Sequence, residues 1–176
     1  LKLLMVLPPE PQTEDQVAKS LGQALVRSTD TIVLVPQSHG YSSLDARTAA
    51  EETVLAMKWA TELFDRKTVT LVGLGNGADA ALGASLLGSE FCDEILLDGH
   101  QLYRDMKEFN SAKVGEALGT NLNQLPYTII SSASTSERSQ LIKSTMDVLG
   151  FQIQIVSPDQ RTLDIPWLTR WYQTRK

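Results

Sequence analysis

The sequence has little of the material from which disulfides and metal sites are built. Its 176 residues include one cysteine, Cys92, and two histidines, His39 and His100. A single cysteine excludes an intramolecular disulfide and any metal site made of several cysteines. The histidines lack the spacing of a helical His-x-x-x-His pair, and a site that gathers both with Asp45 and Asp98 has no motif behind it. We therefore expect no bound metal and no cofactor.

The sequence also lacks an excess of positive charge and a long apolar run. Sixteen Lys and Arg stand against 21 Asp and Glu, for a formal net charge of -5. This balance argues against a nucleic-acid-binding protein, because phosphates call for a basic surface. No apolar run reaches the roughly 18 residues of a membrane-spanning helix. Because the first residue is Leu rather than Met, we expect that preceding residues were removed, and the compartment stays open.

Apolar runs of strand length alternate with longer segments of helical period. The predicted strands are 3–7, 31–35, 68–72, 94–97, 127–130 and 151–156. The predicted helices are 14–26, 45–64, 78–87, 136–149 and 167–173, whereas 101–124 fits neither pattern. Strands that are apolar on both faces and separated by helices indicate a parallel sheet covered on both sides. The sequence thus predicts a single α/β domain over residues 1–176, a three-layer, doubly wound and mainly parallel sheet of about six strands.

The most informative stretch joins the third predicted strand to the helix after it. Three glycines, Gly73, Gly75 and Gly77, stand between the apolar strand and the helix that begins near Ala78. Glycines at such a junction let the chain turn sharply and let the helix pack close to the strand. In doubly wound sheets ligands bind outside the carboxyl ends of the strands, which is where this turn lies.

This stretch resembles the nucleophile elbow of the α/β-hydrolase superfamily, in which small residues flank a nucleophile between a strand and a helix. Gly73, Gly77 and Ala78 match the small positions, and Gly75 stands at the position of the nucleophile. The order of the predicted elements matches the core of that superfamily over nearly the whole chain. The resemblance implies an α/β-hydrolase-like fold, and it implies that an attacking side chain is missing, since glycine cannot form an acyl intermediate.

The resemblance also implies where the other two members of a catalytic triad would stand. The acid position follows the fifth strand, where residues 131–136 contain no Asp, and the base position lies within 157–166, which contain no His. With all three positions vacant, we expect no catalytic residues and no acyl-transfer activity. The interpretation is a catalytically inactive binding or protein-assembly module with a protein partner, and a small-molecule ligand remains open.

Two alternatives stay open at this point. Gly73, Gly75 and Ala78 also fit the dinucleotide fingerprint of Rossmann domains, and Asp98 follows Gly75 by 23 residues, near the expected place of a ribose-binding acid. That reading predicts an oxidoreductase or sensor, but its fingerprint normally belongs to the first strand of the fold. The other alternative is a hydrolase with a relocated site that uses Ser38 or Ser132 as nucleophile with His39 or His100 as base.

The candidate ligand-binding residues are those expected at the carboxyl edge of the sheet: Gly75, Asn76, Gly77, His39 and His100. The free N–H groups where the third helix begins could receive an anion, with Asn76 beside them. Ordinary structural roles compete with each assignment, because Asn76 tolerates a tight turn and a loop histidine is usually just solvated. Cys92 is expected at the opposite edge of the sheet, where burial is its predicted role.

Overall fold

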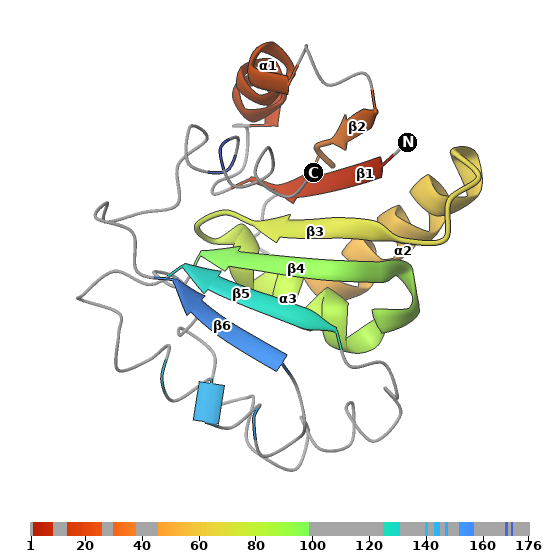
Figure 1. The fold of residues 1–176 in the computed structure, drawn as a ribbon. Coiled ribbons are helices and arrows are strands. Elements are labelled where there is room, and N and C mark those ends of the chain that lie inside the picture. The colour runs from red at the N-terminus through yellow and green to blue at the C-terminus, as the bar shows by residue number, and fades with distance from the viewer. Residues whose placement is uncertain are drawn as a thin grey trace.

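The computed structural model describes residues 2–8, 14–25, 30–37, 46–98, 125–130 and 152–156, with the separate positions 140, 143, 144, 147, 168 and 170. Six strands form one sheet in the order β2-β1-β3-β4-β5-β6, and every neighbouring pair is parallel (Figure 1). The strands are β1 (Lys2–Leu7), β2 (Thr31–Leu34), β3 (Val69–Gly73), β4 (Cys92–Asp98), β5 (Pro126–Ile130) and β6 (Gln152–Val156). This is the predicted α/β-hydrolase-like architecture.

Helices cover both faces of this sheet. They are α1 (Glu14–Leu25), α2 (Ala46–Leu63) and α3 (Gly77–Leu87), and a 3-10 turn η1 (Ser89–Phe91) leads into β4. In Figure 1, α2 and α3 lie together behind the strands, whereas α1 lies beside β1 and β2. The positions described within the predicted helices 136–149 and 167–173 are helical, and the segment 101–124 lies outside the described residues.

The strands β1, β3, β4 and β5 bury both of their faces along most of their length, which explains their apolar sequences, whereas the edge strands β2 and β6 are only partly buried. In β1, Leu3, Met5 and Leu7 belong to the core under α2 and α3, and Leu4 and Val6 belong to a second core. That second core includes Val17 and Leu21 of α1 and Leu168 near the C-terminus.

The direction of winding reverses between β1 and β3. The chain passes from β1 through α1 to β2 on one side, and β3 pairs with the other side of β1. Leu7 and Gly73, the last residues of β1 and β3, are register partners. The carboxyl ends of these two strands therefore meet at the switch point, where doubly wound sheets bind their ligands.

Part of the helix prediction is confirmed in detail. The helical spacing in 45–64 predicts an inward side made of Ala49, Thr53, Ala56, Met57, Ala60 and Phe64. In the structure Ala49, Thr53, Met57 and Ala60 are buried, and Ala56 and Phe64 are partly buried. The glycine turn opens α3 one residue earlier than predicted, at Gly77, and β4 is longer than its apolar run because it includes Cys92 and Asp98. No helix in the described part of the chain has the length and apolar content to cross a bilayer.

Candidate functional site

The candidate site is the turn that joins β3 to α3. The strand ends at Gly73, the helix begins at Gly77, and only three residues lie between them. Gly75 stands at the apex with a φ of 49°, which is the left-handed region that L residues with side chains rarely adopt. The turn is closed by backbone hydrogen bonds from Gly77 N to Leu74 O (2.8 Å) and from Ala78 N to Gly75 O (3.1 Å).

Gly73 is required because the helix packs directly onto the end of its strand. A Cβ atom at Gly73 would lie 2.5 Å from the Cα of Ala78 and 2.8 Å from the carbonyl oxygen of Gly77. Both neighbours are backbone atoms, which cannot move without shifting the helix. The position therefore accepts only glycine in this arrangement.

Gly77 is required for a different contact, with the end of the neighbouring strand. A Cβ atom at Gly77 would lie 2.7 Å from the carbonyl oxygens of Leu7 and Pro8. Leu74 N also donates a hydrogen bond to Leu7 O, at 3.0 Å. The end of β1 thus rests on the turn itself, so the two strands at the switch point are joined by backbone contacts.

The side chain of Asp98, at the end of β4, contacts the apex of the turn. Its Oδ2 accepts a hydrogen bond from Gly75 N at 3.2 Å, and the residue is 5% exposed. In the sequence, Asp98 is a candidate ribose-binding acid because it follows Gly75 by 23 residues. Its contact with the apex of the turn could not be predicted, since nothing in the sequence fixes which strand lies next to β3.

The structure brings together three of the five candidate ligand-binding residues. Gly75, Asn76 and Gly77 are consecutive at the turn, and His39 and His100 lie outside the described residues. Asn76 occupies the N-cap of α3 with a helical φ of -63°, and its side chain makes no capping hydrogen bond. Its place at the helix start is consistent with the predicted anion-binding role, which stays a prediction.

Two prolines, Pro8 and Pro9, follow β1. Proline has no backbone N–H, so neither residue can donate a hydrogen bond from its main chain. In α/β-hydrolases the oxyanion hole combines the amide after the nucleophile with an amide from the loop that follows the strand beside it. Here that loop begins at Pro8, next to Gly77, with two residues that lack the donor.

The remaining reactive groups of the described chain give no second site. Cys92 is buried, as predicted, and its thiol donates to the Met57 sulfur at 3.4 Å. Burial, with smaller contributions from Asp93 and Glu90, raises the pKa of Cys92 from 9.0 to about 12, so it is not a thiolate nucleophile at neutral pH. Among the residues that the structure describes, no group of three or more His, Cys, Asp or Glu could hold a metal ion.

Solved structures with the same architecture were found, although no protein-family model and no curated protein sequence matches the chain. An uncharacterized protein from Bacillus cereus is 15% identical with a TM-score of 0.74; the match covers 98% of this chain and 58% of that protein. YahD, solved with malic acid, is 15% identical with a TM-score of 0.67, covering 100% of this chain and 94% of YahD.

The carboxylesterase of Bacillus cereus is 16% identical with a TM-score of 0.62, and the match covers 98% of this chain and 88% of the enzyme. Likeness at such identities concerns the fold, because one fold carries many functions. The strand order, the glycine turn after β3 and these neighbours together establish that the chain has an α/β-hydrolase-like fold.

Proposed function

We propose that this chain is a catalytically inactive α/β-hydrolase-like domain that acts as a binding or assembly module. The observation that carries the proposal is Gly75 at the apex of the turn between β3 and α3, with a φ of 49°. The turn keeps the shape that exposes a nucleophile in this fold, but the residue there has no side chain. Without an attacking atom, the covalent step of acyl transfer cannot begin.

The surroundings of the turn support the same conclusion. Stabilisation of an oxyanion requires hydrogen-bond donors directed at the place where negative charge develops. Beside this turn lie Pro8, which lacks a backbone N–H group, and the Asp98 carboxylate, which accepts a hydrogen bond from the Gly75 amide. A carboxylate near the apex repels a developing oxyanion, whereas an amide stabilises it.

The sequence supplies no substitute at the other two positions of a triad. Residues 131–136 contain no Asp, and residues 157–166 contain no His. A domain that has this fold but lacks the nucleophile, acid and base can function only by binding other molecules through its surface. This supports a role in binding or assembly with a protein partner. Small-molecule binding at Gly75, Asn76 and Gly77 belongs to the same proposal.

Dinucleotide binding is the alternative, and Asp98 weighs against it. In a Rossmann domain the pyrophosphate lies against the amides of the glycine turn, at the start of the helix. In this chain the Gly75 amide already donates a hydrogen bond to the Asp98 carboxylate, so a pyrophosphate bound there would be repelled by a like charge. Thermal shift measurements with NAD and NADP test the alternative: no shift is expected, and a shift that Gly75→Val abolishes would replace our proposal.

The proposal is tested by labelling with a fluorophosphonate probe, which reacts covalently with an activated serine. We expect no labelling of the protein and no hydrolysis of 4-nitrophenyl acetate above the buffer rate. Gly75→Ser should also remain inactive, with Gly75→Ala as the matched control for the strain of a side chain at positive φ. Stoichiometric labelling of the unmodified protein, or turnover by Gly75→Ser that Gly75→Ala lacks, would overturn the proposal.

A further inference from the structure

The turn between β3 and α3 contains an Asn-Gly pair, Asn76 and Gly77. In such a pair the backbone nitrogen of the glycine can attack the side-chain amide of the asparagine, because glycine has no Cβ atom to hinder the approach. Reactions of this kind make asparagine one of the thermolabile residues of proteins. The proposed function makes no use of this chemistry.

The reaction needs only water as a co-reactant. A bond forms between Gly77 N and Asn76 Cγ, the Gly77 nitrogen gives up its proton, and the Nδ2 atom of Asn76 leaves as ammonia. Water then opens the cyclic imide. Attack of water on Cγ leaves an aspartate at position 76, whereas attack on the main-chain carbonyl carbon leaves an isoaspartate, whose extra carbon lengthens the backbone. Either product carries one more negative charge than the asparagine.

The fold keeps the pair, because position 77 accepts only glycine. A Cβ atom at Gly77 would lie 2.7 Å from the carbonyl oxygens of Leu7 and Pro8. Both are backbone atoms at the end of β1, so a side chain at position 77 would push the helix away from the strand. The glycine that makes the pair reactive is thus the one that lets α3 begin beside β1.

The closed turn holds the two reacting atoms apart. Asn76 has a ψ of -22°, whereas a planar imide ring requires Gly77 N to rotate until it is nearly eclipsed with the Asn76 Cβ. This rotation would break the hydrogen bond of 2.8 Å that Gly77 N donates to Leu74 O. One residue earlier, the Gly75 amide donates to Oδ2 of the buried Asp98 at 3.2 Å. The reaction therefore requires the turn to open.

We infer that Asn76 is a deamidation site, and that Asp98 controls its rate by holding the turn closed. The reaction proceeds from a locally open state, in which Gly77 N has left Leu74 O. Local opening of this kind costs less free energy than complete unfolding. Asp98 acts through the backbone of Gly75 and touches neither reacting atom, so it is a positioning residue.

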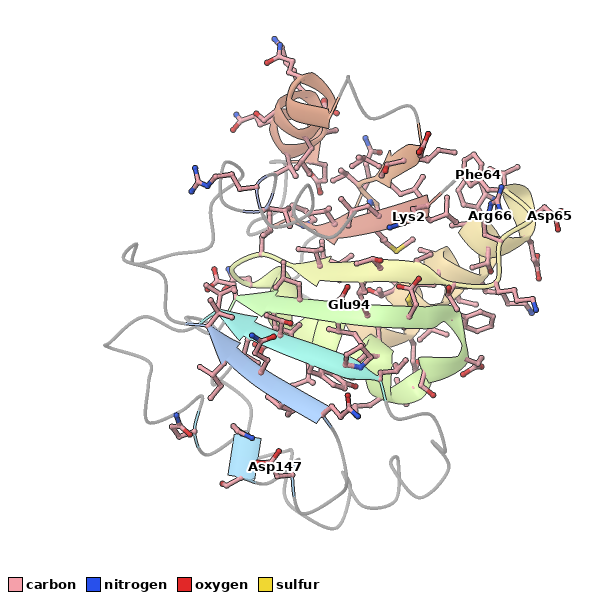
Figure 2. The ribbon with its side chains drawn as sticks, viewed as in Figure 1. Lys2, Phe64, Asp65, Arg66, Glu94 and Asp147 are labelled. Carbon is pink, nitrogen blue, oxygen red and sulfur yellow. The ribbon has the colours of Figure 1, made fainter. Side chains whose placement is uncertain are left out.

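Conversion changes the charge of the candidate site and keeps the fold. An aspartate is as favourable as an asparagine at the start of a helix, and its charge interacts well with the helix dipole. Figure 2 shows Lys2 and Arg66 at the amino edge of the sheet, opposite this turn, so neither cation neutralises the new carboxylate. The turn then carries two carboxylates, at position 76 and at Asp98, and no longer suits an anion.

The first test follows the reaction by mass spectrometry. Trypsin releases residues 68–104 as one peptide in which Asn76 is the only asparagine, so the mass gain of an amide that becomes an acid reports on this site. The protein is incubated at mildly alkaline pH, with an unincubated sample as the reference for digestion. We expect conversion at least about ten times faster in urea that unfolds the chain than in the native protein. Asn76→Ser should show no gain, and it corrects for Gln101 in the same peptide.

The second test is the role of Asp98. Asp98→Ala should speed conversion in the native protein by about tenfold, since the turn loses a hydrogen bond to a charged acceptor. Asp93→Ala removes a carboxylate from the other end of β4 and is the matched control, with the rate of the parent chain. Val69→Ala controls for stability: it removes buried side-chain atoms at the amino end of β3 and leaves the turn untouched, so its rate should also match the parent chain.

Three results would overturn the inference. Equal rates in the native and the urea-unfolded protein would show that the turn gives no protection. Equal rates in Asp98→Ala and Asp93→Ala would show that Asp98 does not hold the turn closed. A rise in Val69→Ala as large as in Asp98→Ala would show that conversion proceeds from the unfolded chain. These outcomes are independent of the proposed function, because deamidation supplies no activated serine for the fluorophosphonate probe.

Discussion

Strand β4 carries an aspartate near each end, and the two are held in different ways. At the amino end Asp93 is exposed, and its two carboxylate oxygens accept hydrogen bonds from the hydroxyl groups of Thr70 (2.9 Å) and Thr68 (3.1 Å). At the carboxyl end Asp98 is buried and accepts a hydrogen bond from the backbone amide of Gly75. Asp93 therefore accepts hydrogen bonds from side chains, whereas Asp98 accepts one from the backbone of the turn.

The difference describes the two edges of the sheet more generally. At the amino edge, hydrogen bonds between the side chains of Thr68, Thr70 and Asp93 add to the backbone pairing of β3 and β4. At the carboxyl edge, β1, β3 and α3 meet through backbone atoms at Gly73 and Gly77, where no Cβ fits. Close contacts between backbone atoms at two glycines thus fix the shape of the candidate site.

The largest expected effect comes from filling the carboxyl edge. Gly73→Val should destabilise the protein by at least about 4 kcal/mol and leave little folded material, because the new side chain would overlap the backbone of α3. Urea unfolding followed by circular dichroism measures the loss. Gly22→Ala in α1 is the control: no atom lies within 4 Å of the added carbon, so we expect stabilisation by about 0.5–1 kcal/mol. Equal stability of Gly73→Val and the parent chain would show that the helix does not rest on the strand.

The next effect compares the two aspartates directly. Asp98→Ala should lower the free energy of unfolding by about 2 kcal/mol, because it removes the buried carboxylate that accepts a hydrogen bond from the half-buried Gly75 amide. Asp93→Ala should lower it by about 1 kcal/mol, since water can replace the carboxylate of an exposed residue. Urea unfolding of both variants gives the two values, and a larger loss for Asp93 would reverse our view of which edge is rigid.

The smallest effect appears only at alkaline pH, again at the amino end of β4. Cys92 precedes Asp93, and its pKa is raised to about 12 in the folded chain from an ordinary 9.0. The unfolded thiol ionises first as the pH rises, so the free energy of unfolding should fall above pH 9, by about 1 kcal/mol at pH 10. Burial also raises the pKa of Tyr127, in the same direction.

Urea unfolding at pH 8, 9 and 10 measures this decline. The slope with pH should be shallower in Cys92→Ala, and Tyr127→Phe should flatten it further where tyrosine ionises. A slope in Cys92→Ala as steep as in the parent chain would mean that the thiol ionises as readily when folded as when unfolded.

The sequence predicted the helices and strands well because their signals are local. The run 3–7 and the pair of prolines after it define β1, and the spacing of Ala49, Thr53, Met57 and Ala60 defines the buried side of α2. Leu55, Trp59 and Leu63 are spaced by four on the other side of α2, and a second apolar row is visible in the sequence alone.

What the sequence determined by itself is the absence of a side chain at Gly75 and the alternation of strands and helices, because both are properties of the chain read residue by residue. Only the tertiary structure decided that β3 lies between β1 and β4. That placement brings Gly77 against Leu7 and Asp98 within hydrogen-bond distance of Gly75. The physical reason is that these contacts join residues far apart in the chain, and their partners are set by the packing of the whole sheet.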